Sequence, residues 1–208
     1  MEIVPSILTQ SKSEIILRLE SLQGLGLTVQ IDFMDGQFVP SRSLAPDDLP
    51  EELMAAPWEA HLMVQQPVAW SQSLYSRGCR RIYWHVEVLP PETTVPHHLS
   101  HIDHGLALRL ETPVAAIEPF VPMIQSVLLL SIREPGFQGH DFQPEVFDKI
   151  KELKNFYPHL KVCVDGGVHI EHLKPLAKMG VDRVAVGNAF WKFGDPNTVL
   201  AAFRQATL

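Results

Sequence analysis

The chain has 208 residues, of which 46% are hydrophobic and 20% charged, a balance typical of one soluble globular domain with a full core. This composition excludes disordered, collagen-like and disulfide-stapled proteins. The formal net charge is −7, and no basic cluster exceeds the pair Arg80 and Arg81, so we expect no nucleic-acid partner.

The sequence also argues against a membrane or secreted protein. No apolar run reaches the roughly 18 residues that span a bilayer, and the first residues lack the pattern of a signal peptide. The two cysteines, Cys79 and Cys163, form no CxxC pair and suit a reducing compartment. We therefore expect a cytoplasmic protein with no membrane partner.

Short β-branched or apolar runs alternate with longer amphipathic stretches along the whole chain, which predicts βα units around a parallel sheet. The predicted strands span residues 3–8, 28–33, 58–63, 81–86, 105–110, 126–132, 161–165 and 183–187. The predicted helices span residues 13–22, 68–76, 144–155, 170–179 and 196–205. The fourth unit has the weakest helical pattern, because Pro90, Pro91 and Pro96 interrupt it.

Eight strands favour an α/β fold of the closed (β/α)8, or TIM-barrel, type. A doubly wound open sheet is the alternative, although such sheets usually have fewer strands. No linker or break in composition divides the chain, so we expect residues 1–208 to form a single domain.

In a (β/α)8 barrel the chemistry lies at the C-terminal ends of the strands. Seven predicted strands carry a polar or ionisable side chain near that end, and the eighth opens a Gly-Asn turn. These residues are Ser6, Asp32, His61, His85, Arg109, Ser131, Asp165 and Gly187. Each has a structural explanation when it is taken singly, but together they indicate a functional site.

Asp32 and Asp165 follow apolar runs, VQI and KVCV, so both carboxylates must lie in the core or at its edge. Burial without a partner would be costly, and the structural alternative for Asp32 is a cap or an internal hydrogen bond. Two acids on different strands can flank one substrate from opposite faces. With His61 they also offer three ligands and an open position to a divalent cation such as zinc.

Glycine turns follow the last three predicted strands, at residues 135–139 (PGFQG), 165–167 (DGG) and 186–188 (VGN). Barrels frequently bind phosphate at this position through exposed backbone N–H groups. Each turn alone is equally a tight βα connection. Their clustering predicts a phosphate site.

Six segments in this order carry a more specific signal. They are PSIL at residues 5–8, D-x-MDG-x-FVP at 32–40, HLMV at 61–64, HVE at 85–87, PGF-x-G at 135–139 and VDGG at 164–167. As a set they resemble the ribulose-phosphate 3-epimerase family through nearly the whole chain. The resemblance implies interconversion of D-ribulose 5-phosphate and D-xylulose 5-phosphate in a (β/α)8 barrel.

The resemblance also assigns roles to residues. It makes Asp32 and Asp165 the pair that transfers the C3 proton through an enediolate. It also makes the two aspartates and His61 ligands of a divalent metal (Zn, Fe, Mn or Co). It places the sugar phosphate on Ser6, His61, Gly136, Phe137, Gln138, Gly139, Gly166, Gly167, Gly187 and Asn188. Family members commonly form oligomers, so a homo-oligomer is expected.

The chain departs from the family at several positions around this site. Gln30 stands where the family has a histidine as its fourth metal ligand, and an amide is a poorer ligand for zinc than imidazole. Three outcomes stay open: a weaker three-ligand site, a metal that prefers oxygen donors, or no metal, with Gln30 donating a hydrogen bond. Gln138 replaces a glycine of the phosphate loop. Arg109, Arg133 and Glu134 are candidates for admitting a different sugar phosphate, although solvation of charged residues near the rim is the simpler explanation.

Two other readings follow from these departures. The chain could be a non-catalytic or weakened barrel that binds a sugar phosphate, or an epimerase of another ketose phosphate. The related hexulose-phosphate synthases and decarboxylases use a D-x-K-x-x-D motif, which this sequence lacks.

Asp35 is expected to be a turn residue, while His85 and Glu87 either support the site or form a hydrogen-bonded pair of the core.

Overall fold

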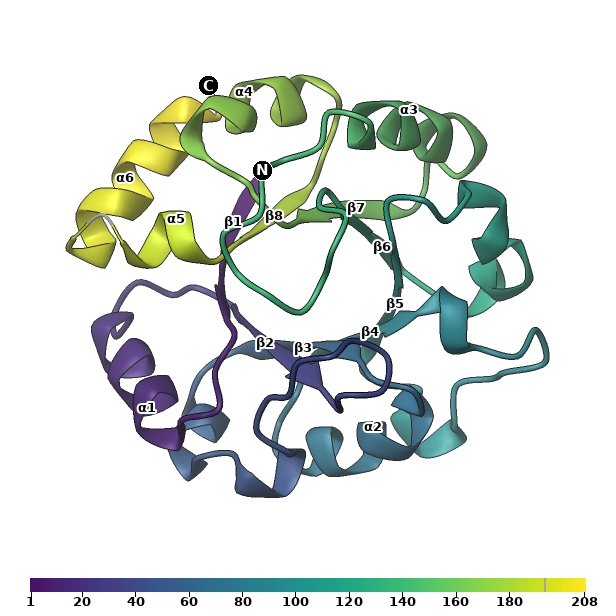
Figure 1. Cartoon of the computed structure of the whole chain (residues 1–208), viewed down its shortest axis with the longest axis horizontal. Helices are drawn as coiled ribbons and strands as arrows, with labels where there is room; N and C mark the ends of the chain where they lie inside the picture. Colours follow the sequence, from purple (N-terminus) through teal and green to yellow (C-terminus); the bar gives the residue numbers. More distant parts are fainter. Residues whose placement is uncertain (193) are drawn as a thin grey trace.

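The computed structural model describes residues 1–192 and 194–208, except for the side chain of His98. Eight parallel strands close into a barrel in sequence order, with β1 paired to both β2 and β8 (Figure 1). The strands are β1 (Glu2–Ile7), β2 (Val29–Met34), β3 (Trp58–Met63), β4 (Arg81–His85), β5 (Asp103–Leu108), β6 (Ser126–Leu130), β7 (Lys161–Asp165) and β8 (Arg183–Val186). The TIM-barrel prediction is confirmed, and the open-sheet alternative is wrong.

Helices surround the barrel, but not after every strand (Figure 1). They are α1 (Lys12–Ser21), α2 (Pro67–Ser76), α3 (Val146–Phe156), α4 (Ile170–Lys178), α5 (Asn188–Trp191) and α6 (Pro196–Ala206). All five predicted helices are present, and the short α5 is the one that the pattern does not predict. None of the helices in the described residues has the length and hydrophobicity needed to span a bilayer.

After β2, β4 and β5 the described chain forms only 3₁₀ turns. They are η1 (Pro46–Asp48), η2 (Glu51–Ala55), η3 (Val86–Val88), η4 (His97–Leu99) and η5 (Val114–Met123). Pro119 and Pro122 lie inside η5 and supply no backbone N–H, which prevents a regular α-helix there. Strand β5 begins and ends two residues earlier than predicted, so Arg109 lies just beyond the strand.

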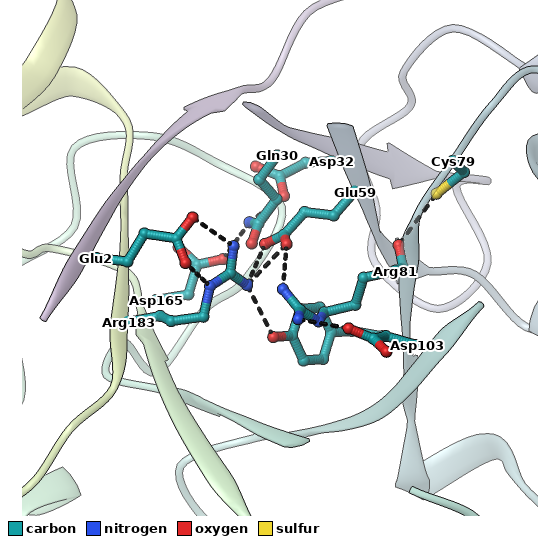
Figure 2. Close-up of polar contacts among 10 residues, drawn as sticks. Glu2, Gln30, Asp32, Glu59, Cys79, Arg81, Asp103, Asp165 and Arg183 are labelled. Carbon is teal, nitrogen blue, oxygen red and sulfur yellow. Dashed lines mark hydrogen bonds and ion pairs between the residues drawn. The ribbon is translucent and has the colours of Figure 1, made fainter. Parts of the chain in front are cut away.

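Charged side chains close the N-terminal end of the barrel. We call this group the barrel floor; its members are Glu2, Glu59, Arg81, Asp103 and Arg183. Arg183 bonds to Glu2 and to the fully buried Glu59, and Arg81 links Glu59 to Asp103 (Figure 2). Because every buried charge has an opposite partner, the floor avoids the penalty of an isolated ion. It lies at the end of the barrel that serves stability, opposite the end that carries chemistry.

Candidate active site

The C-terminal ends of the strands surround a cavity that opens to solvent. Every residue proposed from the motifs for proton transfer or substrate binding lines it: Ser6, Asp32, His61, Gly136, Phe137, Gln138, Gly139, Asp165, Gly166, Gly167, Gly187 and Asn188. The loop between β6 and α3, which carries residues 136–139, crosses the mouth of the barrel in Figure 1.

Asp32, His61 and Asp165 converge at the bottom of this cavity from β2, β3 and β7. His61 Nδ1 lies 3.3 Å from Asp32 Oδ1 and 3.3 Å from Asp165 Oδ2. One ligand atom from each of the three residues lies within 4.8 Å of the other two. Asp32 and His61 are direct neighbours in the β2–β3 register, whereas Asp165 reaches them from a strand three places away around the barrel.

Gln30 lies beside the two carboxylates, one inward-facing position before Asp32 on β2 (Figure 2). Its Nε2 donates to Asp32 Oδ1 at 2.9 Å and to Asp165 Oδ2 at 2.8 Å. Its Oε1 is buried and has no hydrogen-bond partner among the described residues. The arrangement places a neutral donor where the two anionic oxygens approach each other.

The same contacts change the acidity of the group. Burial raises the pKa of Asp32 to about 6, and the nearby charge of Asp165 adds to this, against the hydrogen bonds from His61 and Gln30. Burial alone would lower the pKa of His61, but its hydrogen bonds to Asp165 and Asp32 prevail and raise it to about 9. At neutral pH, without a metal, an imidazolium therefore offsets the carboxylate charges.

Each aspartate commits one oxygen to this network and keeps the other free. Gln30 and His61 contact Oδ1 of Asp32 and Oδ2 of Asp165. No hydrogen bond from the described residues reaches the second oxygen of either carboxylate, although both residues line the cavity. Those two oxygens are available to a substrate.

The donor set also fits a divalent cation. Two carboxylates and one imidazole, with one ligand atom from each within 4.8 Å of the others, match the three-ligand type of catalytic metal site. The unpartnered Oε1 of Gln30 is a fourth oxygen ligand, which half a turn of the carboxamide would bring to the position now held by Nε2. Because an amide binds zinc more weakly than imidazole, Gln30 makes this fourth position a weak one.

The other end of the cavity has the character of an anion site without lysine or arginine. The described lining there consists of the glycine turns after β6, β7 and β8, with the side chains of Gln138 and Asn188 among them. His140 and His169 also line the cavity, and the sequence analysis missed both. Each follows one of the glycine turns at a strand end, and that position is the signal by which they could have been found.

Arg109 and Asp35 lie in loops near the site. Arg109 does not line the cavity; its guanidinium stacks on Phe38, with Cζ 4.4 Å from the ring centre, and donates to the Phe38 carbonyl. The structure therefore gives Arg109 a packing contact with Phe38 and does not place it in the cavity lining. Asp35 is a turn residue, as expected, because Oδ1 accepts from the N–H groups of Gln37 and Phe38.

Comparison with known proteins identifies the same family as these motifs. A model of the ribulose-phosphate 3 epimerase family matches residues 2–191. Ribulose-phosphate 3-epimerase of Schizosaccharomyces pombe is 30% identical over 189 residues, which cover 86% of this chain and 82% of that protein. The cytoplasmic isoform of Oryza sativa subsp. japonica is 28% identical over 214 residues, covering 99% and 93%.

Among solved structures, KGPDC from Streptococcus mutans in complex with D-R5P is similar with a TM-score of 0.73, over 99% of this chain and 96% of that one. At 13% identity this likeness shows a common barrel alone. The family match, by contrast, spans nearly the whole sequence and includes the strands that carry Asp32, His61 and Asp165. The chain belongs to the ribulose-phosphate 3-epimerase family of enzymes.

Proposed function

We propose that this protein inverts C3 of D-ribulose 5-phosphate to give D-xylulose 5-phosphate, and catalyses the reverse reaction. One observation carries the proposal: Asp32 and Asp165, from strands well separated around the barrel, share one cavity, and each keeps an oxygen free of protein hydrogen bonds. Inversion at carbon needs a proton acceptor on one face and a proton donor on the other. Two such carboxylates supply that pair.

The reaction is a proton exchange at C3. One aspartate removes the C3 proton as a carboxylate, and the electrons pass to the neighbouring carbonyl to form an enediolate. The other aspartate, already protonated, delivers a proton to the opposite face of C3. The raised pKa of Asp32 suits this exchange, because a carboxyl group that titrates near 6 both accepts and returns a proton near neutral pH.

His61 and Gln30 hold the reacting carboxylates in place. Each contacts one oxygen of both aspartates and so fixes the direction of the free oxygens. Asp32, His61 and Asp165 would also hold a divalent cation, with Gln30 Oε1 as a weak fourth ligand. When bound, the cation supplies electrophilic stabilisation of the negative charge that develops on the enediolate oxygens.

The phosphate group is assigned to the glycine-lined end of the cavity. Backbone N–H groups of residues 136–139, 166–167 and 187–188 are its donors, with the carboxamides of Gln138 and Asn188 beside them. Because this end lacks lysine and arginine in the described lining, recognition depends on directed hydrogen bonds more than on net positive charge.

The test is isotope exchange with single carboxylate variants. Wild-type protein in heavy water, supplied with divalent metal, should convert either pentulose phosphate into the other and place deuterium at C3. Asp32→Asn and Asp165→Asn should each lose inversion by at least about a hundredfold. Each should still exchange the C3 hydrogen of one epimer, and the two variants should choose opposite epimers, because each retains a base on one face only.

Asp148→Asn is the matched control, since Asp148 is an exposed acid on α3 that does not line the cavity. It should behave as wild type. Loss of exchange with the same epimer in both aspartate variants would show that the two groups act on one face, and that result contradicts the proposal.

Gln30 motivates a second candidate, a barrel that binds a sugar phosphate without turning it over. Its Nε2 already donates to one oxygen of each carboxylate, so these two oxygens have a hydrogen-bond partner when no metal is bound. Calorimetry separates the two candidates. Binding of ribulose 5-phosphate with no conversion in the presence of Zn²⁺, Mn²⁺, Fe²⁺ or Co²⁺ supports the binding barrel, whereas conversion supports the epimerase.

A further inference from the structure

We propose that Glu87 and His85 are positioning residues for His61. They keep one proton on its Nε2, so that Nδ1, the nitrogen that faces Asp32 and Asp165, can release its proton to a cation. The three side chains form one line of hydrogen bonds that ends at the candidate metal group. The inference deepens the proposed function at this site and rests on it only where metal binding is concerned.

The direction of each hydrogen bond follows from Glu87, because an ionised carboxylate can only accept. Its Oε2 lies 2.8 Å from His85 Nδ1, so that nitrogen carries the proton. His85 Nε2 lies 3.0 Å from His61 Nε2 and is left as an acceptor. The proton between the two rings therefore belongs to His61 Nε2.

The line ends at His61 Nδ1, which lies 3.3 Å from both Asp32 Oδ1 and Asp165 Oδ2. With its Nε2 proton committed to His85, the ring has only Nδ1 to offer at the site. Nδ1 donates to the carboxylates when it is protonated, and it presents a lone pair when a cation takes the place of that proton. Two positively charged rings in buried contact would repel each other, so the charge belongs on His61, beside the acids.

The carboxylate oxygen of Glu87 that does not contact His85 is held by the loop after β5. Its Oε1 accepts from the backbone N–H of Arg109 at 2.7 Å and from Thr112 Oγ1 at 2.6 Å. Lys149 holds the same loop by donating to the carbonyl groups of Leu110 and Thr112. The carboxylate therefore has a defined orientation, with one oxygen for the loop after β5 and the other for His85.

This geometry makes Glu87→Gln a directed test. The backbone N–H of Arg109 is always a donor, so the new carbonyl oxygen must face it, and the amide NH₂ must face His85 Nδ1. His85 must then accept at Nδ1 and carry its proton on Nε2. His61 Nε2 must become the acceptor in turn, which puts the single proton of neutral His61 on Nδ1, where a cation would bind.

The first measurement is the long-range ¹H–¹⁵N spectrum of metal-free wild-type protein at neutral pH, with the His85 signals assigned by comparison with His85→Phe. We expect a protonated Nδ1 and an unprotonated Nε2 in His85. In Glu87→Gln the proton should move to Nε2. A wild-type His85 with its proton on Nε2 would overturn the proposal, and this result needs no variant of Glu87 to fold.

The second measurement is Zn²⁺ affinity by competition calorimetry on the metal-stripped protein. Partners that orient a metal-binding histidine typically contribute 10–100-fold to affinity, so Glu87→Gln should weaken Zn²⁺ binding by that factor. Thr112→Val is the matched control: it removes one hydrogen bond from the same carboxylate but leaves an acceptor facing His85, and its affinity should stay within about threefold of wild type.

Equal losses in Glu87→Gln and Thr112→Val would show that Glu87 acts only through packing, and would overturn the proposal. The spectrum and the calorimetry involve no substrate. Failure of the epimerase assignment therefore leaves them unaffected, and failure of the hydrogen-bond line leaves the isotope-exchange test unaffected.

Discussion

Gln30 Nε2 lies 2.8 Å from Oδ2 of Asp165, and this hydrogen bond joins β2 to β7 across the barrel. The resemblance to the family leads us to expect a histidine at the position of Gln30. Instead an amide Nε2 donates to the two acids, and the amide oxygen, the atom that would bind a cation, has no hydrogen-bond partner in the described part of the chain. We therefore expect the affinity for metal to be the property that depends most directly on this residue.

Gln30→His should raise the affinity of the metal-stripped protein for Zn²⁺ by at least about tenfold. Imidazole is a better zinc ligand than an amide, and the other three ligands are already within 4.8 Å of one another. Competition calorimetry measures the change directly. Gln30→Leu is the control, because it removes both amide atoms without adding a ligand, and its affinity should not rise. A Gln30→His protein that binds Zn²⁺ no more tightly than wild type would contradict the assignment of Gln30 as the weak fourth position.

The pH dependence of stability should reveal His61 in the metal-free protein. Its pKa is about 9 in the folded chain, against an ordinary value of 6.5, because hydrogen bonds to Asp165 and Asp32 outweigh its burial. A raised pKa of a base means that the stabilisation is fully present below pH 6.5 and is lost as the pH rises through 9. Its size follows from the shift and is about 3 kcal/mol.

The measurement is urea unfolding of wild type and His61→Asn, in EDTA, between pH 6.5 and 9.5. The difference between their free energies of unfolding should shrink by about 3 kcal/mol across this window. Asp32 adds little to the slope there, because its pKa of about 6 leaves most of it ionised at pH 6.5 and nearly all of it at higher pH. A difference that stays constant with pH would show that His61 carries no proton between the two acids.

Much of this site could be predicted because polar residues recur near the C-terminal ends of the predicted strands. Asp32, His61 and Asp165 each lie near the C-terminal end of a mostly apolar predicted strand, and parallel strands bring these ends to one mouth. Contacts between distant side chains could not be predicted in this way. Nothing near Arg109 in the sequence identifies Phe38 as its stacking partner, and the direction of the Gln30 amide depends on Asp165, 135 residues later.

Gly167→Ala should damage the phosphate end of the cavity. Gly167 has φ +63°, and an added Cβ would lie 2.6 Å from the backbone nitrogen of Phe142 and 2.8 Å from the His140 carbonyl oxygen. The loop that carries residues 136–140 must shift to relieve this contact, so KM for ribulose 5-phosphate should rise by at least about tenfold, the effect of losing one good hydrogen bond to a charged group. Steady-state kinetics of the folded variant measure it.

Gly26→Ala separates this contact from backbone strain. Gly26 has nearly the same φ, +64°, but nothing lies within 4 Å of an added Cβ. Both variants should lose stability from the left-handed conformation, by about 1 kcal/mol. Only Gly167→Ala should lose substrate affinity. Equal KM values in the two variants would mean that the turn after β7 does not shape the phosphate site.

Arg183→Met should lower stability without touching the chemistry. Arg183 lies between Glu2 and the fully buried Glu59 in the barrel floor, and its Nη1 is 2.7 Å from Glu59 Oε2. Removing it leaves Glu59 with Arg81 alone, and breaking a buried ion pair on one side typically costs about 3–5 kcal/mol. For a chain of this length that corresponds to a fall in Tm of roughly 10 °C. The kcat measured well below Tm should stay within about twofold of wild type, because the floor lies at the opposite end of the barrel from the cavity.

Lys151→Met is the comparison, since Lys151 forms an ion pair of similar length with Asp148, 2.9 Å, but both side chains are exposed on α3. Its effect on the free energy of unfolding should stay below about 1 kcal/mol, because water screens the pair. Calorimetric unfolding of the two variants measures the contrast. If Arg183→Met unfolds at the wild-type temperature, then Glu59 is already neutralised by Arg81 or by a proton. The stability of the floor would then not depend on the ion pair between Arg183 and Glu59.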